Sequence, residues 1–213
     1  MTKSKPPPRL NRTPRSSRKR RREHAGQSSQ VRIIGGKWRG RKLPFTPLPG
    51  LRPTLGRTRE TLFNWLRGSL HDCSCLDLFA GSGALGFEAL SQGAAQVTFV
   101  EQHRQTAQQI QRNLDALHST ERSVASQVII SDALEFLPNH PSGYQVVFLD
   151  PPFEDPDLLV KCLGLLEANA DLKFVYLETD RLAILEPVLA TTRFRLKKQT
   201  RAGEAHGLLI VPD

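Results

Sequence analysis

The chain has 213 residues, 38% of them hydrophobic, so it can bury the core of one domain of ordinary size without disulfide bonds. Lys and Arg outnumber Asp and Glu by 30 to 21, and this excess of positive charge indicates a polyanionic partner. No apolar run approaches the length of a membrane span or of a signal sequence, and we expect neither.

The positive charge lies in the N-terminal part of the chain. Residues 1–60 hold 18 Lys and Arg against two acids, a net charge of +16, whereas residues 61–213 hold 12 against 19, a net charge of −7. Residues 1–29 have almost no apolar side chain, so we predict a disordered basic arm. Such an arm favours nucleic acid as the partner, with an anionic membrane second; a tail that only keeps the protein soluble is the alternative.

The three cysteines, Cys73, Cys75 and Cys162, form neither a disulfide framework nor a zinc-binding set. We interpret them as reduced thiols of a cytoplasmic protein. The six histidines show no spacing typical of a metal site, so the sequence predicts no metal.

We expect the folded part of the chain to begin near Val31. Apolar residues at 31–34, then Gly35-Gly36, then residues 37–43 predict a β-hairpin, because two glycines readily form a two-residue turn. Cations alternate with Trp38 in this hairpin, a mixture suited to phosphate contacts and base stacking. A solvated hairpin whose tryptophan packs on the protein body is the alternative. Within an extension assigned to residues 30–50, the predicted RNA contacts are Arg32, Lys37, Trp38, Arg39, Arg41 and Lys42.

A helix is predicted at 58–67, after a proline-rich connector at 44–51. Its buried stripe is expected to consist of Leu62, Phe63, Trp65 and Leu66. Arg52, Arg57 and Arg59 cluster around the start of this helix and are candidates for binding a phosphate or a carboxylate.

A strand, a glycine turn and a helix follow. Residues 75–79 indicate a short buried strand, Gly81, Gly83 and Gly86 form a G-x-G-x-x-G pattern, and residues 84–90 continue as an apolar helix. Glycines let the backbone approach a ligand closely, but the pattern alone is weak, since many such turns carry glycine for packing only. A second buried strand, 97–101, ends in an acid 20 residues after Gly81, where a nucleotide-binding fold places a carboxylate on ribose hydroxyls.

Strands and helices then alternate to the end of the chain. Further strands are predicted at 128–130, 146–149 and 174–178, with helices at 105–117, 134–137, 157–167 and 182–189, and two closing strands at 194–198 and 207–211. This order predicts an α/β fold over residues 51–213, with a mostly parallel sheet of seven strands covered by helices on both faces. The closing strands lack a helix between them, so we expect them to pair antiparallel.

The most specific signal is Asp150-Pro-Pro-Phe153, at the end of the strand 146–149. Two prolines fix an extended turn without N–H donors, so the Asp150 carboxylate and the Pro151 carbonyl are held as acceptors beside an aromatic ring. Such a set suits a planar substrate with an exocyclic amino group, whose N–H groups the acceptors bind and whose plane the ring holds. A turn that only terminates the strand is the structural alternative.

These motifs resemble known proteins. Asp77-x-Phe-Ala-Gly-Ser-Gly83 with Asp150-Pro-Pro-Phe153 resembles the class I S-adenosylmethionine-dependent methyltransferases of amino nitrogens. More narrowly, the blocks 31–43, Leu51-Arg-Pro-Thr54 and 59–66 resemble the bacterial RsmD family, which methylates N2 of one guanine in 16S ribosomal RNA. The resemblance covers about residues 31–212 and leaves the basic arm outside. Adenine and glutamine methyltransferases have Asn-Pro-Pro-Tyr at this motif, where the present chain has Asp for Asn and Phe for Tyr.

The resemblance implies a role for each motif. Asp77 and the glycine turn would line the methionine end of S-adenosylmethionine, Glu101 would bind its ribose, and Asp132 with Ala133 would meet its adenine. The full cofactor-binding set is Asp77, Phe79, Ala80, Gly81, Gly83, Glu101, Asp132 and Ala133, the catalytic set is Asp150, Pro151, Pro152 and Phe153, and the N-terminal blocks add Arg52, Thr54 and Arg59 to the RNA contacts.

The predicted function is therefore guanine-N2 methylation of 16S ribosomal RNA, by a cytoplasmic monomer acting on an assembling small ribosomal subunit. Two alternatives remain at this stage. One is an adenine-N6 or other amino-nitrogen methyltransferase acting on nucleic acid or protein. The other is an inactive RNA-binding factor for ribosome assembly, against which the intact Asp150-Pro-Pro-Phe153 motif argues.

Overall fold

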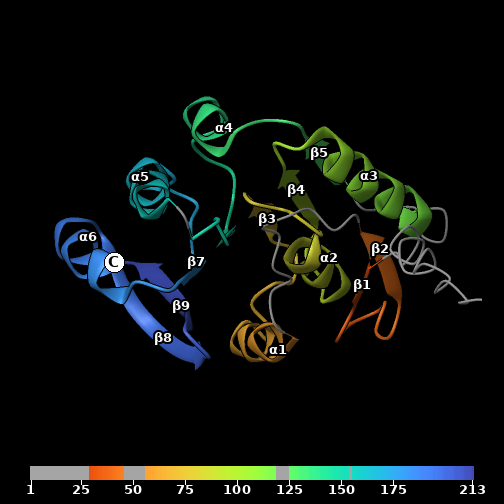
Figure 1. Ribbon diagram of the computed structural model, residues 1–213, viewed down its shortest axis with the longest axis horizontal. Helices are drawn as coiled ribbons and strands as arrows, with labels where there is room; N and C mark the ends of the chain where they lie inside the picture. The colour runs from red at the N-terminus through yellow and green to blue at the C-terminus, as the bar shows by residue number, and fades with distance from the viewer. Residues whose placement is uncertain (1–28, 46–55, 119–124, 154) are drawn as a thin grey trace, which may run out of the picture.

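The computed structural model describes residues 29–45, 56–118, 125–153 and 155–213, which form a seven-stranded sheet between two layers of helices and a separate two-stranded hairpin (Figure 1). The hairpin strands are β1 (Ser29–Arg32) and β2 (Lys42–Phe45). The sheet strands are β3 (Ser74–Asp77), β4 (Gln96–Val100), β5 (Gln127–Ile129), β6 (Val146–Leu149), β7 (Phe174–Thr179), β8 (Phe194–Ala202) and β9 (Ala205–Pro212). The helices are α1 (Gly56–Trp65), α2 (Ala84–Ser91), α3 (Arg104–His118), α4 (Ala133–Asn139), α5 (Pro156–Leu166) and α6 (Leu185–Thr191), the last preceded by a 3-10 turn, η1 (Leu182–Ile184).

The strand order confirms the predicted fold class. It is β5-β4-β3-β6-β7-β9-β8, in which β3 to β7 are parallel and β9 lies antiparallel between β7 and β8. The strands β8 and β9 pair as the predicted antiparallel hairpin because only a short turn joins them. The order reverses between β3 and β6, and in open α/β sheets such a switch point is where ligands bind beyond the carboxyl ends of the strands.

The two faces of the sheet bury separate cores. On one face, residues of α1, α2 and α3 pack with Cys75, Phe148 and Tyr176 of the sheet. On the other face, residues of α4, α5 and α6 pack with alternate sheet positions such as Leu149 and Leu177. Because side chains of a strand point to opposite faces in turn, the near-continuous apolar strands in the sequence already required this double covering.

The hairpin exists, but the predicted two-residue turn at Gly35-Gly36 is wrong. In the register of β1 and β2, Arg32 pairs with Lys42, so the connection runs from residue 33 to residue 41. Gly36 instead lies against the last turn of α2, with a positive φ of 71°. A Cβ atom added to Gly36 would stand 1.8 Å from the carbonyl oxygen of Ser91. Only glycine therefore lets the two backbones approach this closely.

This connection is fastened to α2 by the buried carboxylate of Glu88. The backbone N–H of Ile34 donates to Oε2 at 2.8 Å and that of Gly35 to Oε1 at 2.7 Å. Ser91 continues the contact, since its Oγ donates to the Gly35 carbonyl at 2.6 Å and accepts from the Trp38 N–H at 2.9 Å. We call this set of contacts between residues 34–38 and Glu88–Ser91 the α2 clasp. It makes the hairpin part of the folded domain.

Several expectations lie outside the described residues, among them the disorder of residues 1–28, the connector after Phe45, and the positions of Arg52 and Thr54. Ser29, which the prediction assigned to the arm, is the first residue of β1. The predicted buried stripe of this helix is confirmed for Leu62 and Phe63 of α1 and for Leu66 just after it, whereas Trp65 is only half-buried. Among the helices described, none has the length and apolar character needed to cross a membrane.

Candidate active site at the carboxyl edge of the sheet

Five neighbouring parallel strands each carry an acid at or just beyond the carboxyl end. These acids are Asp77 on β3, Glu101 after β4, Asp132 after β5, Asp150 after β6 and Glu178 on β7. The strands bring them to one edge of the sheet although the acids are spread over about half of the chain. Among the described residues, no three His, Cys, Asp or Glu side chains are grouped closely enough to hold a metal ion.

The buried side chain of Asp77 fixes the position of the glycine turn. Its carboxylate is buried and accepts the backbone N–H of Gly86, in the first turn of α2, at 2.9 Å. Two glycines of the G-x-G-x-x-G pattern are sterically required. Gly83 precedes α2 with a φ of 76°, and a Cβ on Gly86 would stand 2.2 Å from the Phe99 ring. The turn therefore lets α2 pack tightly on β4 and leaves its own backbone at the sheet edge.

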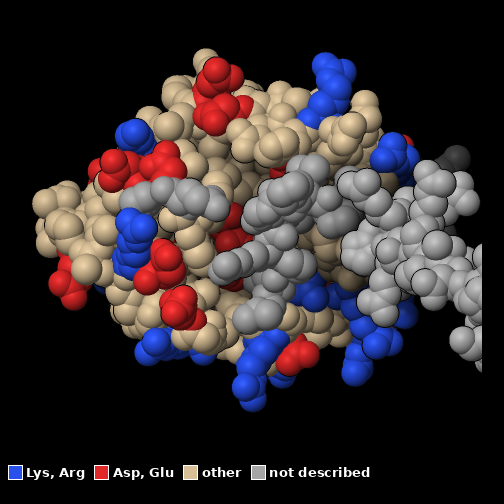
Figure 2. Space-filling view, viewed as in Figure 1, with Lys and Arg blue, Asp and Glu red and all other residues tan. Residues whose placement is uncertain are grey.

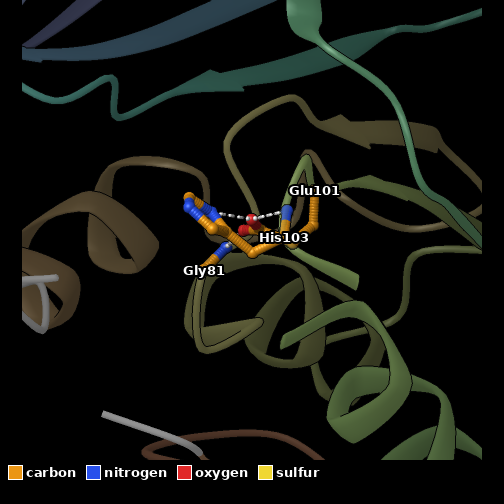
Figure 3. A network of polar contacts seen from close by, with 3 residues as sticks. All are labelled: Gly81, Glu101 and His103. Atoms are coloured by element: carbon orange, nitrogen blue, oxygen red, sulfur yellow. Dashed lines mark hydrogen bonds and ion pairs between the residues drawn. The ribbon is translucent and has the colours of Figure 1, made fainter. Parts of the chain in front are cut away.

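Glu101 joins the glycine turn to the start of α3 (Figure 3). Its Oε2 accepts the Gly81 N–H at 2.9 Å, and its Oε1 accepts the His103 N–H at 2.8 Å. The His103 ring lies over the same carboxylate, with Nδ1 3.0 Å from Oε1 (Figure 3). The acid is buried, whereas the side chain of His103 is 56% exposed. Glu101 thus stands beside the glycine turn as predicted for a ribose-binding acid, and His103 covers it on the solvent side.

The turn after β6 stands next to this edge. Asp150 is half-buried, Pro151 is buried, Pro152 is exposed and Phe153 is half-buried. Both prolines and Phe153 line a small surface hollow together with Glu178 of the neighbouring strand. A larger hollow, of about 400 Å³, lies elsewhere, between β2 and α3, and is bordered by cations of the hairpin.

Two acids at this edge, Asp77 and Glu178, have a raised pKa. Burial raises the pKa of Asp77 to about 7; the hydrogen bond from Gly86 opposes this, and the charges of Asp150 and Glu101 add to it. Burial and the charge of Asp150 raise the pKa of Glu178 to about 8, against the hydrogen bond from Tyr176. Where these acids are ionised, their negative charge would stabilise a cation bound at this edge.

Known proteins share this chain's sequence and fold. The family described as "Conserved hypothetical protein 95" matches residues 31–210. Ribosomal RNA small subunit methyltransferase D of Escherichia coli K12 is 49% identical over 160 residues, which cover 74% of this chain and 78% of the relative. The protein of the same name from Haemophilus influenzae is 44% identical over 179 residues, which cover 82% of this chain and 90% of the relative. The chain belongs to the RsmD family of S-adenosylmethionine-dependent rRNA methyltransferases.

A solved structure agrees with this assignment to the RsmD family. That of the E. coli protein yhhF has a TM-score of 0.74 to this chain at 42% sequence identity, and the match covers 87% of this chain and 99% of that one. The predicted fold is therefore that of an experimentally determined relative.

The structure overturns two of the predicted RNA contacts, Trp38 and Arg59. Trp38 is only 1% exposed and packs in the core with Phe63 and Phe87, so its ring is not available to stack on a base. Arg59 is buried as well, and its Nη2 donates to the Arg32 carbonyl at 3.0 Å. Both side chains fasten the hairpin to the domain, because the α2 clasp draws this segment onto the core. The alternative in which the tryptophan packs on the protein body is the correct one.

The other described cations of the hairpin are on the surface. Arg32, Lys37, Arg39, Arg41 and Lys42 are all exposed, as a nucleic-acid contact requires.

The predicted cofactor-binding residues differ in their exposure to solvent. Phe79 and Gly81 are half-buried and Asp132 is exposed, whereas Ala80, Gly83 and Ala133 are buried. Asp132 also caps α4, since its Oδ1 accepts the Leu134 N–H at 2.7 Å.

Sequence reasoning missed Glu178 and His103. Glu178 ends the apolar run Phe174-Val-Tyr-Leu as Glu101 ends Val97-Thr-Phe-Val, so the same strand-end signal was present. His103 carries no such signal, because a histidine two residues after an acid is common and only the fold of the β4–α3 turn brings its ring onto Glu101.

Proposed function

We propose that this protein transfers a methyl group from S-adenosylmethionine to the exocyclic N2 of one guanine in 16S ribosomal RNA, during maturation of the small subunit in the cytoplasm, as a monomer. The observation that carries the proposal is the Asp150-Pro-Pro-Phe153 turn beside the glycine turn, at the switch point of an RsmD-family sheet. The turn offers acceptors and a ring to an amino-bearing base, and the adjoining edge offers negative charge to a cationic methyl donor.

The residues at the edge fit S-adenosylmethionine. The pKa of Asp77 is raised by burial and then by the charges of Asp150 and Glu101, and the sulfonium and ammonium charges of the cofactor would offset these effects. Glu101 has a carboxylate at the glycine turn, and a carboxylate offers about four acceptor positions, so ribose hydroxyls can share it with Gly81 and His103. Ala133, buried at the start of α4, would leave room for the flat face of the adenine next to Asp132. His103 would turn away or bind the same hydroxyls.

Asp150 is the residue we assign to the chemistry. The unstacked guanine would lie on Phe153, at a cost of a few kcal/mol for leaving its stack. The Asp150 carboxylate and the Pro151 carbonyl would accept its N2–H groups and aim the nitrogen lone pair. S-adenosylmethionine, when bound, would supply an electrophilic methyl carbon to N2 and a sulfur that keeps the electron pair of the C–S bond. Asp150 would stabilise the positive charge that develops on N2 and accept the released proton.

The RNA is expected to lie along a cationic band. Figure 2 shows Lys and Arg side chains along the lower edge of the molecule, below β8, α1 and the hairpin. Exposed cations are found on each of these elements: the hairpin cations, Arg57 and Arg67 near the ends of α1, and Lys197, Lys198 and Arg201 of the edge strand β8. Lysines on an edge strand also prevent strand-to-strand aggregation, so their RNA contacts need the separate test given below.

The test is methylation of a defined substrate. Purified protein is incubated with labelled S-adenosylmethionine and small ribosomal subunits from cells that lack the modification, and the RNA is digested to nucleosides. Label in N2-methylguanosine at one site supports the proposal. Label only in N6-methyladenosine or in protein contradicts it, as does binding of the particle without transfer by protein that binds S-adenosylmethionine.

A further inference from the structure

The hollow of about 400 Å³ lies where strand β2 and helix α3 run side by side (Figure 1). We call it the β2–α3 hollow. Its volume is within the range of sites that hold small organic ligands. Part of its lining is apolar, and the buried side chains of Leu43 and Leu117 fix that part to the core. Its cationic lining residues, all exposed, are Arg41, Lys42 and Arg112.

The guanidinium of Arg112 is held in one orientation. Its Nε and Nη2 both donate to Oε1 of Gln109, at 3.2 and 2.8 Å. Gln109 in turn donates to Oδ1 of the buried Asn113 at 3.2 Å, and Asn113 donates to the carbonyl of Pro44 in β2 at 2.9 Å. A guanidinium has five N–H groups, and these contacts use two, so three remain for an anion.

The positive charge of the hollow is not neutralised by a described acid. Among the ion pairs between described residues, none includes Arg41, Lys42 or Arg112. Asp115 is the only acid of α3, and its Oδ1 accepts a hydrogen bond from Gln111 at 2.9 Å. An anion in the hollow would therefore meet cations from both of its walls, β2 and α3.

The hollow is connected to the candidate active site but is separate from it. Helix α3 begins beside Glu101 at the carboxyl edge, and Arg112 lies eight residues after the first residue of α3, about 12 Å along the helix. At the other wall, β2 ends at Phe45, which packs on Ala84 at the start of α2. The hollow is thus too far away to hold the target base, but a substrate that spans both can reach it.

We propose that the β2–α3 hollow binds a nucleotide of 16S RNA other than the target guanine, with its phosphate held by Arg112, Arg41 and Lys42. The planar fork of a guanidinium matches phosphate oxygens, and the apolar lining gives the sugar or base a surface to contact. Further exposed cations of the hairpin adjoin the hollow, and they favour the repeated phosphates of RNA over a single anion. The inference rests on the proposed function and assigns to it a site that positions the RNA.

The first test removes the oriented charge. In Arg112→Gln, the Kd for small subunits that lack the modification should rise roughly tenfold, the loss expected for a hydrogen bond to a charged group. The slope of log K against log salt concentration should become shallower by about 1. kcat at saturating particle should be unchanged, because the hollow does not contact the base that is methylated. Lys161→Gln, at an exposed cation of α5, is the matched control and should change none of these values.

A second variant distinguishes the hollow from a flat cationic surface. Ala116→Phe adds a ring to the lining and keeps every charge, so Kd should rise roughly 3- to 10-fold while the salt slope stays unchanged. Ala168→Phe, at an exposed position after α5, is the control for the added ring and should leave Kd unchanged. Circular dichroism reports whether each variant folds. If Ala116→Phe does not, Gln109→Ala replaces it, since it keeps every charge and removes the acceptor that orients Arg112.

Cross-linking identifies what enters the hollow. A photoreactive diazirine amino acid is placed at position 42, and the protein is irradiated while bound to the small subunit. A cross-link to a 16S nucleotide other than the target guanine supports the inference. Cross-links to ribosomal proteins alone, or to no part of the particle, contradict it.

The possible results separate this inference from the proposed function. If the wild-type protein forms N2-methylguanosine and folded Arg112→Gln and Ala116→Phe bind the particle as the wild type does, the hollow is not an RNA site and the function stands. If the wild-type protein forms no N2-methylguanosine, the function itself is wrong. Weaker binding in both variants, with kcat kept and both controls unchanged, supports the inference.

Discussion

Two buried acids of this chain, Glu88 in the α2 clasp and Glu178 at the carboxyl edge, have opposite surroundings. Glu88 is fully buried, and backbone N–H groups of Ile34 and Gly35 donate to both of its oxygens. Glu178 is almost as buried, but it accepts a hydrogen bond from the Tyr176 hydroxyl and lies near a second acid, Asp150. Backbone donors stabilise a buried carboxylate, whereas a second acid destabilises it. An acid of the first kind holds the fold together, whereas an acid of the second kind lowers stability where it is ionised.

The largest expected effect tests whether Asp150, at the carboxyl edge of the sheet, takes part in methyl transfer. Asp150→Asn should lower kcat by on the order of 10²–10³-fold, because an amide neither stabilises positive charge on N2 nor accepts its proton as the carboxylate does. Binding of S-adenosylmethionine, measured by calorimetry, should remain nearly unchanged, and the free energy of unfolding should not fall. A loss of cofactor binding as large as the loss of kcat would show that Asp150 is structural.

The next largest effect tests whether the α2 clasp contributes to the free energy of unfolding. Gly36→Ala should lower the free energy of unfolding by about 1–3 kcal/mol more than Gly40→Ala, because both glycines have positive φ but only Gly36 lies against another backbone. Gly40 has open space around its Cα, so it is the matched control for backbone strain. Urea unfolding followed by circular dichroism measures both. Equal losses would mean that the clasp contributes no contact of its own.

The pH dependence of stability sharpens the contrast between the two acids. The raised pKa of Glu178, about 8, means that the unfolded chain loses this proton at lower pH than the folded one. Glu178 therefore favours the folded state fully at acid pH, and this contribution is lost as pH rises from about 4.5 through 8. Asp77, with a pKa of about 7, acts in the same direction.

In Glu178→Gln, the slope of unfolding free energy against pH between 5 and 8 should become less negative, by at most about 1.4 kcal/mol per pH unit. Glu88→Gln should instead lower stability by about 1–3 kcal/mol at every pH in this window, since its amide would face backbone donors. Chemical denaturation at several pH values measures both. An unchanged slope in Glu178→Gln would contradict the raised pKa.

The smallest expected effect concerns the exposed cations of the hairpin, which the α2 clasp attaches to the domain, and of β8. Arg39→Ala should reduce the slope of log K against log salt concentration for binding of the small subunit by about 1, the value for one lost phosphate contact. Lys161→Ala, an exposed cation on α5 in the other helical layer, should leave the slope unchanged. The same comparison with Lys198→Ala decides whether β8 belongs to the band. Equal slopes for all variants would remove these residues from the RNA interface.

The order and type of the strands and helices, and most of the candidate site, could be predicted from the amino-acid sequence alone. Apolar strands ending in Asp77, Glu101 and Asp150 are local patterns, and parallel strands must bring their carboxyl ends to one edge. The register of β6 and β7, which places Glu178 beside Asp150, depends on contacts between distant segments, and no local pattern encodes it. The same holds for Gly35-Gly36 and Trp38. Their local sequence favours a tight exposed turn, but burial of the indole and the carboxylate of Glu88 draw the segment onto α2 instead. Only the tertiary structure could decide which of these residues face solvent, because exposure depends on what packs against them.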